Sequence, residues 1–539
     1  RKDAFGTLRK EGGISGFPKR KESSCDAYDA GHSSNSISAA LGYVRARDLC
    51  GQDYRVVAVI GDGALTGGMA YEAMNNAALL KTNFIIVLND NTMSISRNIG
   101  GMSIYLSAIR TAQAYTGLKL KVTKTLNRIP GIGEKIVDNV RKTKSSIKQL
   151  FIPGMLFENM GLTYLGPVDG HDMRQMMRLF NEAKKVNGPV LVHVLTEKGR
   201  GYEPARRHPD RFHGTGPFTI STGKPLEKKN NPAFTVIFSK AVCELGEKYP
   251  SLAAITAAMP EGTGLSRFAR KYPDRFFDVG IAEEHAVSFA AGLALGGMIP
   301  VAAIYSSFLQ RAFDQLMHDI CMQNLHVVFA IDQAGFVGAD GETHHGCFDL
   351  SYLSLMPNMV VLAPKDGKEL KQMLEYAVQA EGPVAIRYPK GEACTFPDTG
   401  EVPISSGVHD ILHKGREVCI LSVGSMTETA FSAVSKLQAE GICPSLVNVR
   451  FVHPLDTALL DRLAEKYHAL VTIEENVQSG GYGEHVKAYM EEKHPEVRTA
   501  SLAVPDRFWS HGSVSSLRCQ AGISEDDLIQ AVKDSWEKR

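Results

Sequence analysis

The sequence lacks the features that define several large protein classes. Its formal net charge is only +1, so no excess of one sign indicates nucleic acid or a membrane surface as a partner. No apolar run reaches the roughly 18 residues that a membrane-spanning helix needs. The first ten residues contain no apolar core of a secretion signal.

The sequence also lacks any regular arrangement of cysteines. The nine cysteines form no C-x-x-C pair, and their number is odd. A disulfide framework would need an even set with regular spacing. The pattern therefore favours a reducing, cytoplasmic setting.

What the chain does contain is a regular alternation of short apolar runs with helical patterns. Its 539 residues are too many for one hydrophobic core, so several domains are expected. The runs Val56–Ile60, Phe84–Leu88 and Val190–Leu195 are typical of buried strands. Strands that alternate with helices predict an α/β fold with parallel sheets. Further strands are expected at Phe276–Gly280, Val301–Ile304, His326–Ile331, Met359–Leu362, Val384–Arg387, Val418–Val423, Ser445–Val449 and Ala469–Glu474, and helices at Ile37–Leu49, Gly67–Leu80 and Met173–Lys185.

Two polar stretches divide the chain. Ser221–Pro232 and Phe396–Gly407 have no periodicity, which is typical of linkers. We therefore expect three α/β domains, at residues 1–225, 226–400 and 401–539.

One basic segment suggests nucleic-acid binding at first sight. Lys119–Lys148 carries nine Lys or Arg against Glu134 and Asp138. It includes residues 129–135 (IPGIGEK), which look like the turn of a helix-hairpin-helix. Because this is one short match in a neutral chain, we expect a solvated segment and no nucleic-acid partner.

Two strand ends carry polar side chains that suit a metal. Gly61-Asp62-Gly63 follows the first strand, and Asn89-Asp90-Asn91 follows the next. One crossover puts both at the carboxyl edge of a parallel sheet, where such sheets bind ligands. Carboxylate and amide oxygens suit Mg²⁺ shared with a phosphate. The alternative is a strand-end turn followed by an ordinary asparagine.

Two further segments suit an anion. Gly31-His32-Ser33-Ser34 precedes a helical pattern, so Ser33 or Ser34 is expected to cap that helix and His32 to face an anion with its amides. Lys198 follows the strand Val190–Leu195 and suits a diphosphate oxygen. The alternatives are a capping turn with a structural histidine and a surface lysine.

These segments resemble a known family. GHSSNSISAALG, GDGALTGGMAYEAMNNA, NDNTMSIS, GPVDGHD and KGRGYEPA are together similar to the 1-deoxy-D-xylulose-5-phosphate synthase family, thiamine-diphosphate enzymes of the transketolase superfamily. The match runs to the end of the chain. The resemblance implies that Mg²⁺ is held by Asp62, Asn91 and the carbonyl of Met93. It implies that the diphosphate and thiazolium side is bound by His32, Ser33, Ser34, Gly63, Ala64, Asn91 and Lys198, with His32 also catalytic.

The same resemblance assigns Glu283 to cofactor activation. A carboxyl group that hydrogen-bonds the aminopyrimidine ring favours the tautomer that takes the thiazolium proton. The alternative is that Glu283 and Glu284 only complement a helix N-terminus. The resemblance also puts Phe308 against the aminopyrimidine, although aromatic residues are often plain core. It makes His344 catalytic and lines the substrate channel with Tyr305, Arg311, Asp340, His344 and Arg387.

The implied reaction joins pyruvate to D-glyceraldehyde 3-phosphate with loss of carbon dioxide, and it feeds isoprenoid, thiamine and pyridoxal synthesis. The implied enzyme is a homodimer whose site lies between two domains. Two alternatives are a transketolase-type enzyme with another donor or acceptor and a silent paralogue that only binds the cofactor.

The sequence departs from the family at two points. The family has an upstream Gly-His-Gln motif with an active-site histidine, which this sequence lacks. Either the sequence is a fragment, as we expect, or the histidine is genuinely absent. The family also has Asp-Arg-Ala-Gly where this chain has Asp332-Gln333-Ala334-Gly335. The arginine at this position is a phosphate anchor in the family, so the departure bears on the identity of the acceptor and not on that of the cofactor.

Overall fold

The computed structural model describes residues 1–94, 98–111, 155–226, 232–397 and 402–537. The described residues form two compact units. The smaller unit comprises His32–Glu227 with Gly280–Ala282, and the larger unit comprises Arg1–Gly31, Lys228–Val279 and Glu283–Arg539. The basic segment and its helix-hairpin-helix motif lie outside the described residues.

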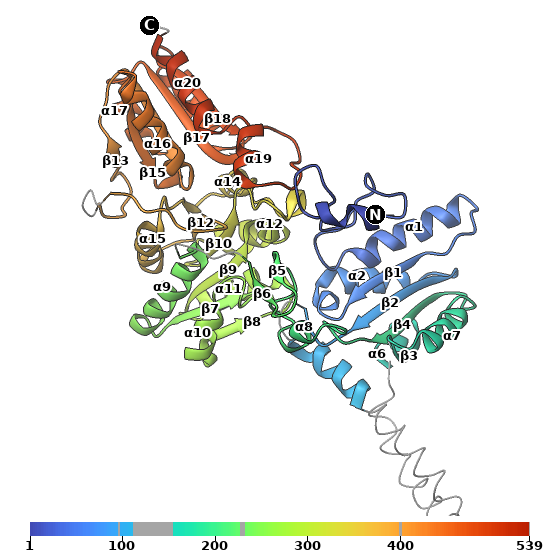
Figure 1. Cartoon of the computed structure of the whole chain (residues 1–539). Coiled ribbons are helices and arrows are strands. Elements are labelled where there is room, and N and C mark those ends of the chain that lie inside the picture. The colour runs from blue at the N-terminus through green and yellow to red at the C-terminus, as the bar shows by residue number, and fades with distance from the viewer. Residues whose placement is uncertain (95–97, 112–154, 227–231, 398–401, 538–539) are drawn as a thin grey trace, which may run out of the picture. The chain divides into compact units, whose positions relative to one another are not determined.

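The smaller unit is built on a four-stranded parallel sheet with the order β1-β2-β4-β3 (Figure 1). Its strands are β1 (Val57–Gly61), β2 (Phe84–Asp90), β3 (Thr163–Asp169) and β4 (Pro189–Leu195). Its helices include α1 (Ser36–Leu49), α2 (Gly68–Ala77), α6 (Met155–Asn159), α7 (Met173–Ala183) and α8 (Glu203–Arg207), and residues 100–111 are also helical.

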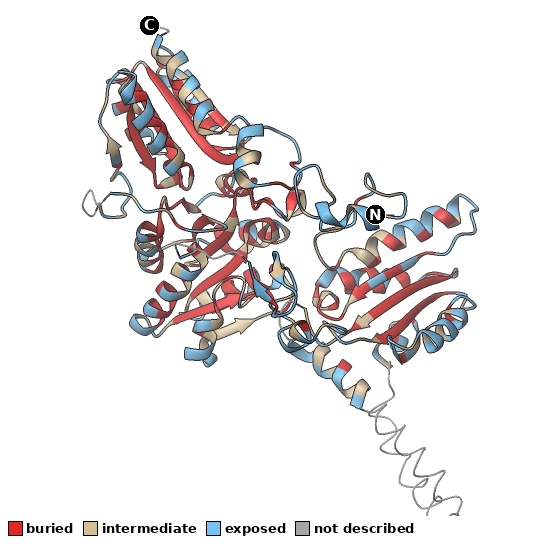
Figure 2. Cartoon of the chain, viewed as in Figure 1, coloured by how far each residue is buried: buried red, intermediate tan, exposed pale blue. Residues whose placement is uncertain are grey.

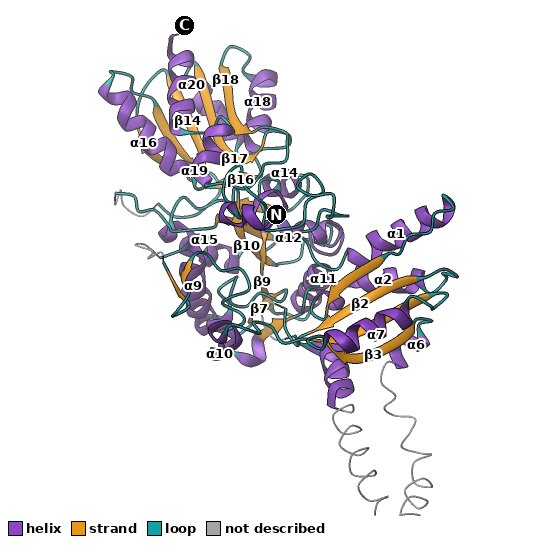
Figure 3. Ribbon diagram, turned by 45° about the vertical axis from the view of Figure 1, so that its right-hand side comes forward, coloured by secondary structure: helices purple, strands orange, loops and turns teal. Residues whose placement is uncertain are grey.

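Alternation along β2 shows why helices cover both faces of this sheet. Phe84, Ile86 and Leu88 pack into one buried cluster, which includes residues of α1 and α2. Ile85 and Val87 pack into the other, with Ala183 at the end of α7. Successive side chains of a strand point to opposite faces, so a strand buried on both faces is apolar throughout. Figure 3 shows the strands of this sheet in orange and its helices in purple.

The larger unit contains a seven-stranded sheet with the order β16-β11-β12-β10-β9-β7-β8. Its strands are β7 (Leu252–Thr256), β8 (Phe276–Asp278), β9 (Ile299–Tyr305), β10 (Val328–Ala334), β11 (Val360–Leu362), β12 (Val384–Pro389) and β16 (Phe451–His453). Its longer helices are α9 (Phe234–Lys248), α10 (Ser266–Lys271), α11 (Glu283–Leu295), α14 (Asp349–Ser354) and α15 (Gly367–Gln379). The strands are parallel except β16, which runs antiparallel to β11.

A five-stranded sheet follows in the same unit, with the order β13-β15-β14-β17-β18. Its strands are β13 (Asp410–His413), β14 (Val418–Val423), β15 (Ser445–Val449), β17 (Ala469–Val477) and β18 (Arg498–Val504). Its helices are α16 (Met426–Ala439), α17 (Thr457–Ala464), α18 (Tyr482–Lys493), α19 (Val514–Gln520) and α20 (Glu525–Glu537).

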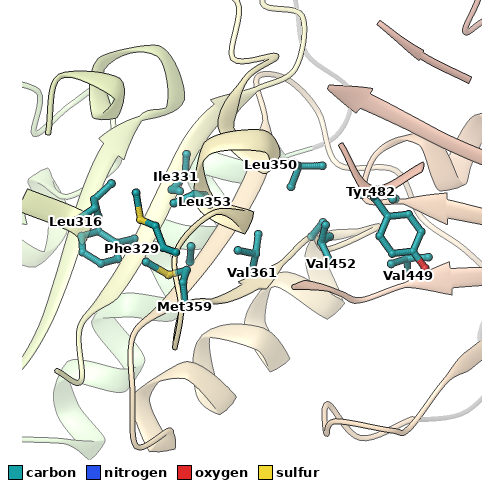
Figure 4. Packing of buried hydrophobic residues seen from close by; sticks show 14 of the residues in the cluster. Leu316, Phe329, Ile331, Leu350, Leu353, Met359, Val361, Val449, Val452 and Tyr482 are labelled. Atoms are coloured by element: carbon teal, nitrogen blue, oxygen red, sulfur yellow. The ribbon is translucent and has the colours of Figure 1, made fainter. Parts of the chain in front are cut away.

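One hydrophobic core spans these two sheets. Phe329 of β10, Val361 of β11 and Val449 of β15 belong to the same buried cluster (Figure 4). The buried strands and inward helix faces are red in Figure 2. The two sheets therefore share apolar packing within one unit.

Most expected elements are confirmed, and three expectations were wrong in detail. The N-cap of α1 is Asn35 rather than Ser33 or Ser34, and its side chain makes no capping bond. The expected strand at Phe276–Gly280 ends at Asp278, because Gly280 has a left-handed φ of 77°. The stretch after Ser221 is not all linker, because β6 (Lys224–Pro225) pairs with β5 (Phe218–Thr219).

Residues Arg1–Gly31 cluster with the larger unit rather than with the sheet that follows them. The division into three domains stays a prediction. Within the described residues, no helix combines the length and the apolar character that crossing a membrane requires.

Candidate functional site

The first group of expected site residues lies at the carboxyl edge of the smaller unit's sheet. Asp62 directly follows β1, and Asn91 directly follows β2. The two strands are parallel neighbours, with Gly61 of β1 opposite Asn89 of β2. Lys198 follows β4, the next strand in the sheet. The strand order β1-β2-β4 therefore brings Asp62, Asn91 and Lys198 to one edge, of which the crossover expected from sequence covered Asp62 and Asn91. We call Asp62, Asp90, Asn91, Thr92 and Met93 the strand-end cluster.

The Asp62 carboxylate is buried and only half satisfied. Its Oδ2 accepts a hydrogen bond of 2.7 Å from the Thr92 amide. Its Oδ1 is buried and meets no hydrogen-bond donor among the residues that the structure describes. Burial, together with the Asp90 carboxyl group against it, raises the pKa of Asp62 to about 7. Two facing carboxyl groups with one orphaned oxygen form a site that suits a cation.

The backbone of the strand-end cluster is held in an uncommon conformation. Thr92 has a φ of 69°, which is rare for a β-branched residue. Asn91 Oδ1 accepts a hydrogen bond of 3.0 Å from the Met93 amide. Gly63 has no room for a side chain, because a Cβ there would lie 2.5 Å from the Cβ of Ser94. The turn therefore packs tightly around the two strand ends.

A cavity of about 860 Å³ opens beside this cluster. Its lining includes Asn91, Thr92, Met93, Arg110, Lys198 and Asp210. The Lys198 ammonium group donates to the Ser94 carbonyl and lies 3.0 Å from His213 Nδ1. Burial lowers the pKa of Lys198, although Asp210 and Asp62 oppose this shift. The ammonium group of Lys198 and the guanidinium of Arg110 on the cavity wall suit an anionic ligand.

Residues 32–34 lie at the turn before α1. Ser34 is buried with a φ of 75°, and its hydroxyl donates a 2.7 Å hydrogen bond to the carbonyl of Ala64. His32 and Ser33 are half-buried. The serine thus ties the turn to the Gly63–Ala64 loop rather than capping the helix.

The second group of expected site residues lies in the larger unit. Glu283, at the start of α11, is buried, and its Oε2 lies 3.3 Å from the Arg311 guanidinium. Burial raises the pKa of Glu283, and Arg311 opposes the shift. A carboxyl group that holds its proton more readily than usual is suited to donate a hydrogen bond to a ring nitrogen.

Aromatic side chains continue this group. Phe308 stacks on Tyr305 with ring centroids 5.6 Å apart and meets His344 edge-on at 5.3 Å. Phe308 is half-buried rather than plain core. We call Glu283, Tyr305, Phe308, Arg311, Asp340 and His344 the Glu283 cluster.

The N-terminal segment contributes to this cluster, which the sequence did not reveal. Phe17 stacks on His344 at 4.9 Å with an interplanar angle of 15°. Arg9 forms an ion pair with Asp340, whose second oxygen lies 2.8 Å from Lys390. Although burial favours the protonated form, Lys390 and Arg9 hold the pKa of Asp340 below its ordinary value. No local pattern marks such contacts, because they join residues far apart in the chain.

Arg387 occupies a different setting from the one expected. Its guanidinium is buried, lies 3.0 Å from Asp349, and donates to the carbonyls of Gly346 and Glu475. These partners engage Nε and one of the two terminal nitrogens of the guanidinium inside the protein. The role of Arg387 as a phosphate anchor therefore stays a prediction that this geometry does not favour.

Comparison with known proteins gives a consistent answer along the chain. Three family models match: 1-deoxy-D-xylulose-5-phosphate synthase at residues 1–196, the transketolase pyrimidine-binding domain at 230–395 and the transketolase C-terminal domain at 407–528. A 1-deoxy-D-xylulose-5-phosphate synthase of Lachnoclostridium phytofermentans is 50% identical over 99% of this chain and 85% of its own length. One of Carboxydothermus hydrogenoformans is 50% identical over 100% of this chain and 86% of its own.

Two solved structures are also similar. A split-gene transketolase described as an inactive β4 tetramer is 31% identical, with a TM-score of 0.51, and the match covers 57% of this chain and 99% of that one. A transketolase of Campylobacter jejuni matches 94% of this chain and 82% of its own with a TM-score of 0.50. At 17% identity, this second likeness shows the fold alone.

Proposed function

Because this chain belongs to the 1-deoxy-D-xylulose-5-phosphate synthase family of transketolase-type transferases, we propose that it condenses pyruvate with D-glyceraldehyde 3-phosphate, with loss of carbon dioxide, to give 1-deoxy-D-xylulose 5-phosphate. The observation that carries this proposal is 50% identity to enzymes of that name over 99% or more of the chain. Dependence on thiamine diphosphate follows from family membership. This cofactor supplies the carbon nucleophile and the electron sink for the decarboxylation.

Mg²⁺ is the metal that we propose for the strand-end cluster. The buried Oδ1 of Asp62, which has no hydrogen-bond donor within the described residues, supports this. A cation would bind that oxygen and offset the repulsion between the Asp62 and Asp90 carboxylates. Asn91 and the carbonyl of Met93 would complete an all-oxygen donor set, which suits Mg²⁺. Lys198 and the neighbouring cavity fit the diphosphate that Mg²⁺ would share.

In the larger unit, we propose that Glu283 hydrogen-bonds the aminopyrimidine and that Phe308 packs against its face. The burial of Glu283 and the raised pKa of its carboxyl group support this role. Tyr305, Arg311, Asp340 and His344 would then face the substrates. His344 is held between Phe17 and Phe308, which fixes its ring for a proton transfer.

A second candidate is a related enzyme with a different aldehyde acceptor. It is favoured by Gln333, which stands where the family has its phosphate-binding arginine.

We also propose a homodimer and three domains by analogy with the family. Light scattering on the purified protein tests the homodimer, and limited proteolysis tests the division into three domains.

The decisive experiment measures carbon dioxide release and sugar-phosphate formation with thiamine diphosphate and Mg²⁺. We expect one carbon dioxide for each 1-deoxy-D-xylulose 5-phosphate when pyruvate and D-glyceraldehyde 3-phosphate are both present. Transfer from a ketose phosphate without carbon dioxide would indicate a transketolase. Cofactor binding without turnover would indicate a silent paralogue.

A further inference from the structure

A chain of buried hydrogen bonds lies behind the strand-end cluster. The hydroxyl of Tyr164 in β3 lies 2.7 Å from His193 Nδ1 in β4, and His193 Nε2 lies 3.0 Å from Asp90 Oδ2 at the end of β2. The side chains of His193 and Asp90 are both 0% exposed. Polar groups buried this deeply inside a sheet are costly unless each partner is fixed.

The second oxygen of Asp90 is held from the other side. Its Oδ1 lies 3.0 Å from a guanidinium nitrogen of Arg110 and accepts a hydrogen bond of 3.3 Å from the Thr92 amide. Arg110 also lines the cavity of about 860 Å³. The two oxygens of Asp90 therefore have different partners, which fixes the plane of the carboxylate.

This carboxylate bears directly on the proposed metal ligands. The Thr92 amide is shared between Asp62 and Asp90, and Thr92 sits between Asn91 and Met93 in a left-handed conformation. A strained backbone persists only where its surroundings over-determine it. Without Asp90, the turn would lose one of the two acceptors that hold the Thr92 amide.

We propose that Asp90 is the positioning residue for the metal site, and that His193 and Tyr164 orient Asp90. The inference rests on the proposed function, because it concerns the same metal. Partners that orient metal ligands typically change metal affinity about 10- to 100-fold when they are removed. Metal affinity in this protein therefore depends on a histidine and a tyrosine that touch no metal ligand themselves.

The test uses Mn²⁺ as a paramagnetic probe, because it shares the oxygen preference of Mg²⁺. Electron paramagnetic resonance measures the Mn²⁺ Kd of the protein with thiamine diphosphate, without any turnover. For His193→Gln we expect the Kd to rise about 10- to 100-fold with an altered spectrum of bound Mn²⁺. For Tyr164→Phe, which removes one hydroxyl, we expect a rise of about 2- to 10-fold.

Asn83→Ala is the matched control. Asn83 is buried and immediately precedes β2, at the end of the strand away from Asp90. Its side-chain amide donates to the carbonyls of Ala183 and Val186. Its replacement should lower the Tm of the protein and leave the Mn²⁺ Kd and spectrum unchanged. A general loss of packing would instead move the Kd of all three variants together, and that result would overturn the inference.

The remaining outcomes are separable. If the parent protein does not bind Mn²⁺ with thiamine diphosphate, the proposed function fails. If the parent binds Mn²⁺ and both His193→Gln and Tyr164→Phe bind it equally well, only the inference fails. Should His193→Gln not fold, the smaller change in Tyr164→Phe decides the matter alone.

Discussion

The carboxylate of Asp62 accepts a 2.7 Å hydrogen bond from the Thr92 amide through one oxygen and buries the other with no donor within the described parts of the chain. A side chain with this arrangement is held in place before any ligand arrives. The hydrogen bond fixes the direction of the free oxygen, so its binding partner is selected by position as well as by charge.

Asp62→Asn should weaken metal and cofactor binding together. The change keeps an oxygen ligand but removes a negative charge beside Mg²⁺ and a diphosphate, so we expect a higher Mg²⁺ requirement and weaker thiamine diphosphate binding. Isothermal titration at several Mg²⁺ concentrations measures both. Asp172→Asn is the control, because Asp172 accepts from two backbone amides at the start of α7 and is not one of the proposed metal ligands. Cofactor binding independent of Mg²⁺ in the parent would contradict the assignment.

Glu283→Gln should abolish activation and spare binding. The variant keeps the size of the side chain but cannot supply the carboxyl proton, so we expect loss of hydrogen–deuterium exchange at the thiazolium carbon and little change in cofactor affinity. Nuclear magnetic resonance after quenched exchange measures this. Glu284→Gln changes the neighbouring carboxylate and should exchange normally. Normal exchange in Glu283→Gln would remove Glu283 from the mechanism.

Gln333→Arg should improve use of the phosphorylated acceptor. A charged hydrogen bond contributes about 1.5–3 kcal/mol, which corresponds to roughly a 10- to 100-fold change in affinity. Gln333 has a φ of 61°, but both residues carry a Cβ, so the substitution adds no backbone strain. We expect a lower KM for D-glyceraldehyde 3-phosphate and an unchanged KM for pyruvate. An unchanged acceptor KM would mean that another cation already fills this role or that the acceptor carries no phosphate.

Arg387→Met separates a structural role from phosphate binding. Removal of one partner from a buried ion pair costs about 3–5 kcal/mol, because Asp349 is left buried and uncompensated. We therefore expect a clear fall in Tm, and partial recovery when Asp349→Asn is added. The acceptor KM of the folded fraction should stay near that of the parent. A normal Tm with a raised acceptor KM would restore the phosphate-anchor assignment.

Glu474→Gln should change how stability depends on pH. Glu474 in β17 is buried and accepts from the amides of Tyr482 and Gly483, and burial raises its pKa from 4.5 to about 7. The folded protein thus binds this proton more tightly than the unfolded chain, so stability falls as pH rises from 4.5 to 7. At 1.36 kcal/mol per pH unit, the free energy of unfolding falls by about 3 kcal/mol over this range.

Glutamine cannot ionise, so the Tm of Glu474→Gln should fall less than that of the parent between pH 5 and 7.5. Thermal scans of both proteins across this range measure the difference. Parallel pH profiles would show that Glu474 does not titrate in this window.

Sequence reasoning succeeded where local pattern and topology agree. The apolar runs of β1 and β2 and one crossover were enough to bring Asp62 and Asn91 to neighbouring strand ends. It failed where conformation depends on distant partners. Ser34 looked like a helix cap, but its hydroxyl bonds Ala64 and its backbone is left-handed.

Two other features could not be seen in the sequence. His193 lies within the apolar strand pattern Val190–Leu195, and nothing in that pattern indicates its hydrogen bond with Asp90. Arg9 and Phe17 contact Asp340 and His344 across more than half of the chain. Such pairs are created by the tertiary fold, and neither propensity nor periodicity encodes them.

The short strand β16 has a practical consequence for dissecting this protein. Although β16 comes after β13, β14 and β15 in the chain, it forms the outer edge of the seven-stranded sheet beside β11. A polypeptide cut near residue 400 would leave the β11 edge unpaired, and open edges associate with other strands. Two co-expressed halves should therefore rejoin by strand complementation, whereas the first half expressed alone should aggregate.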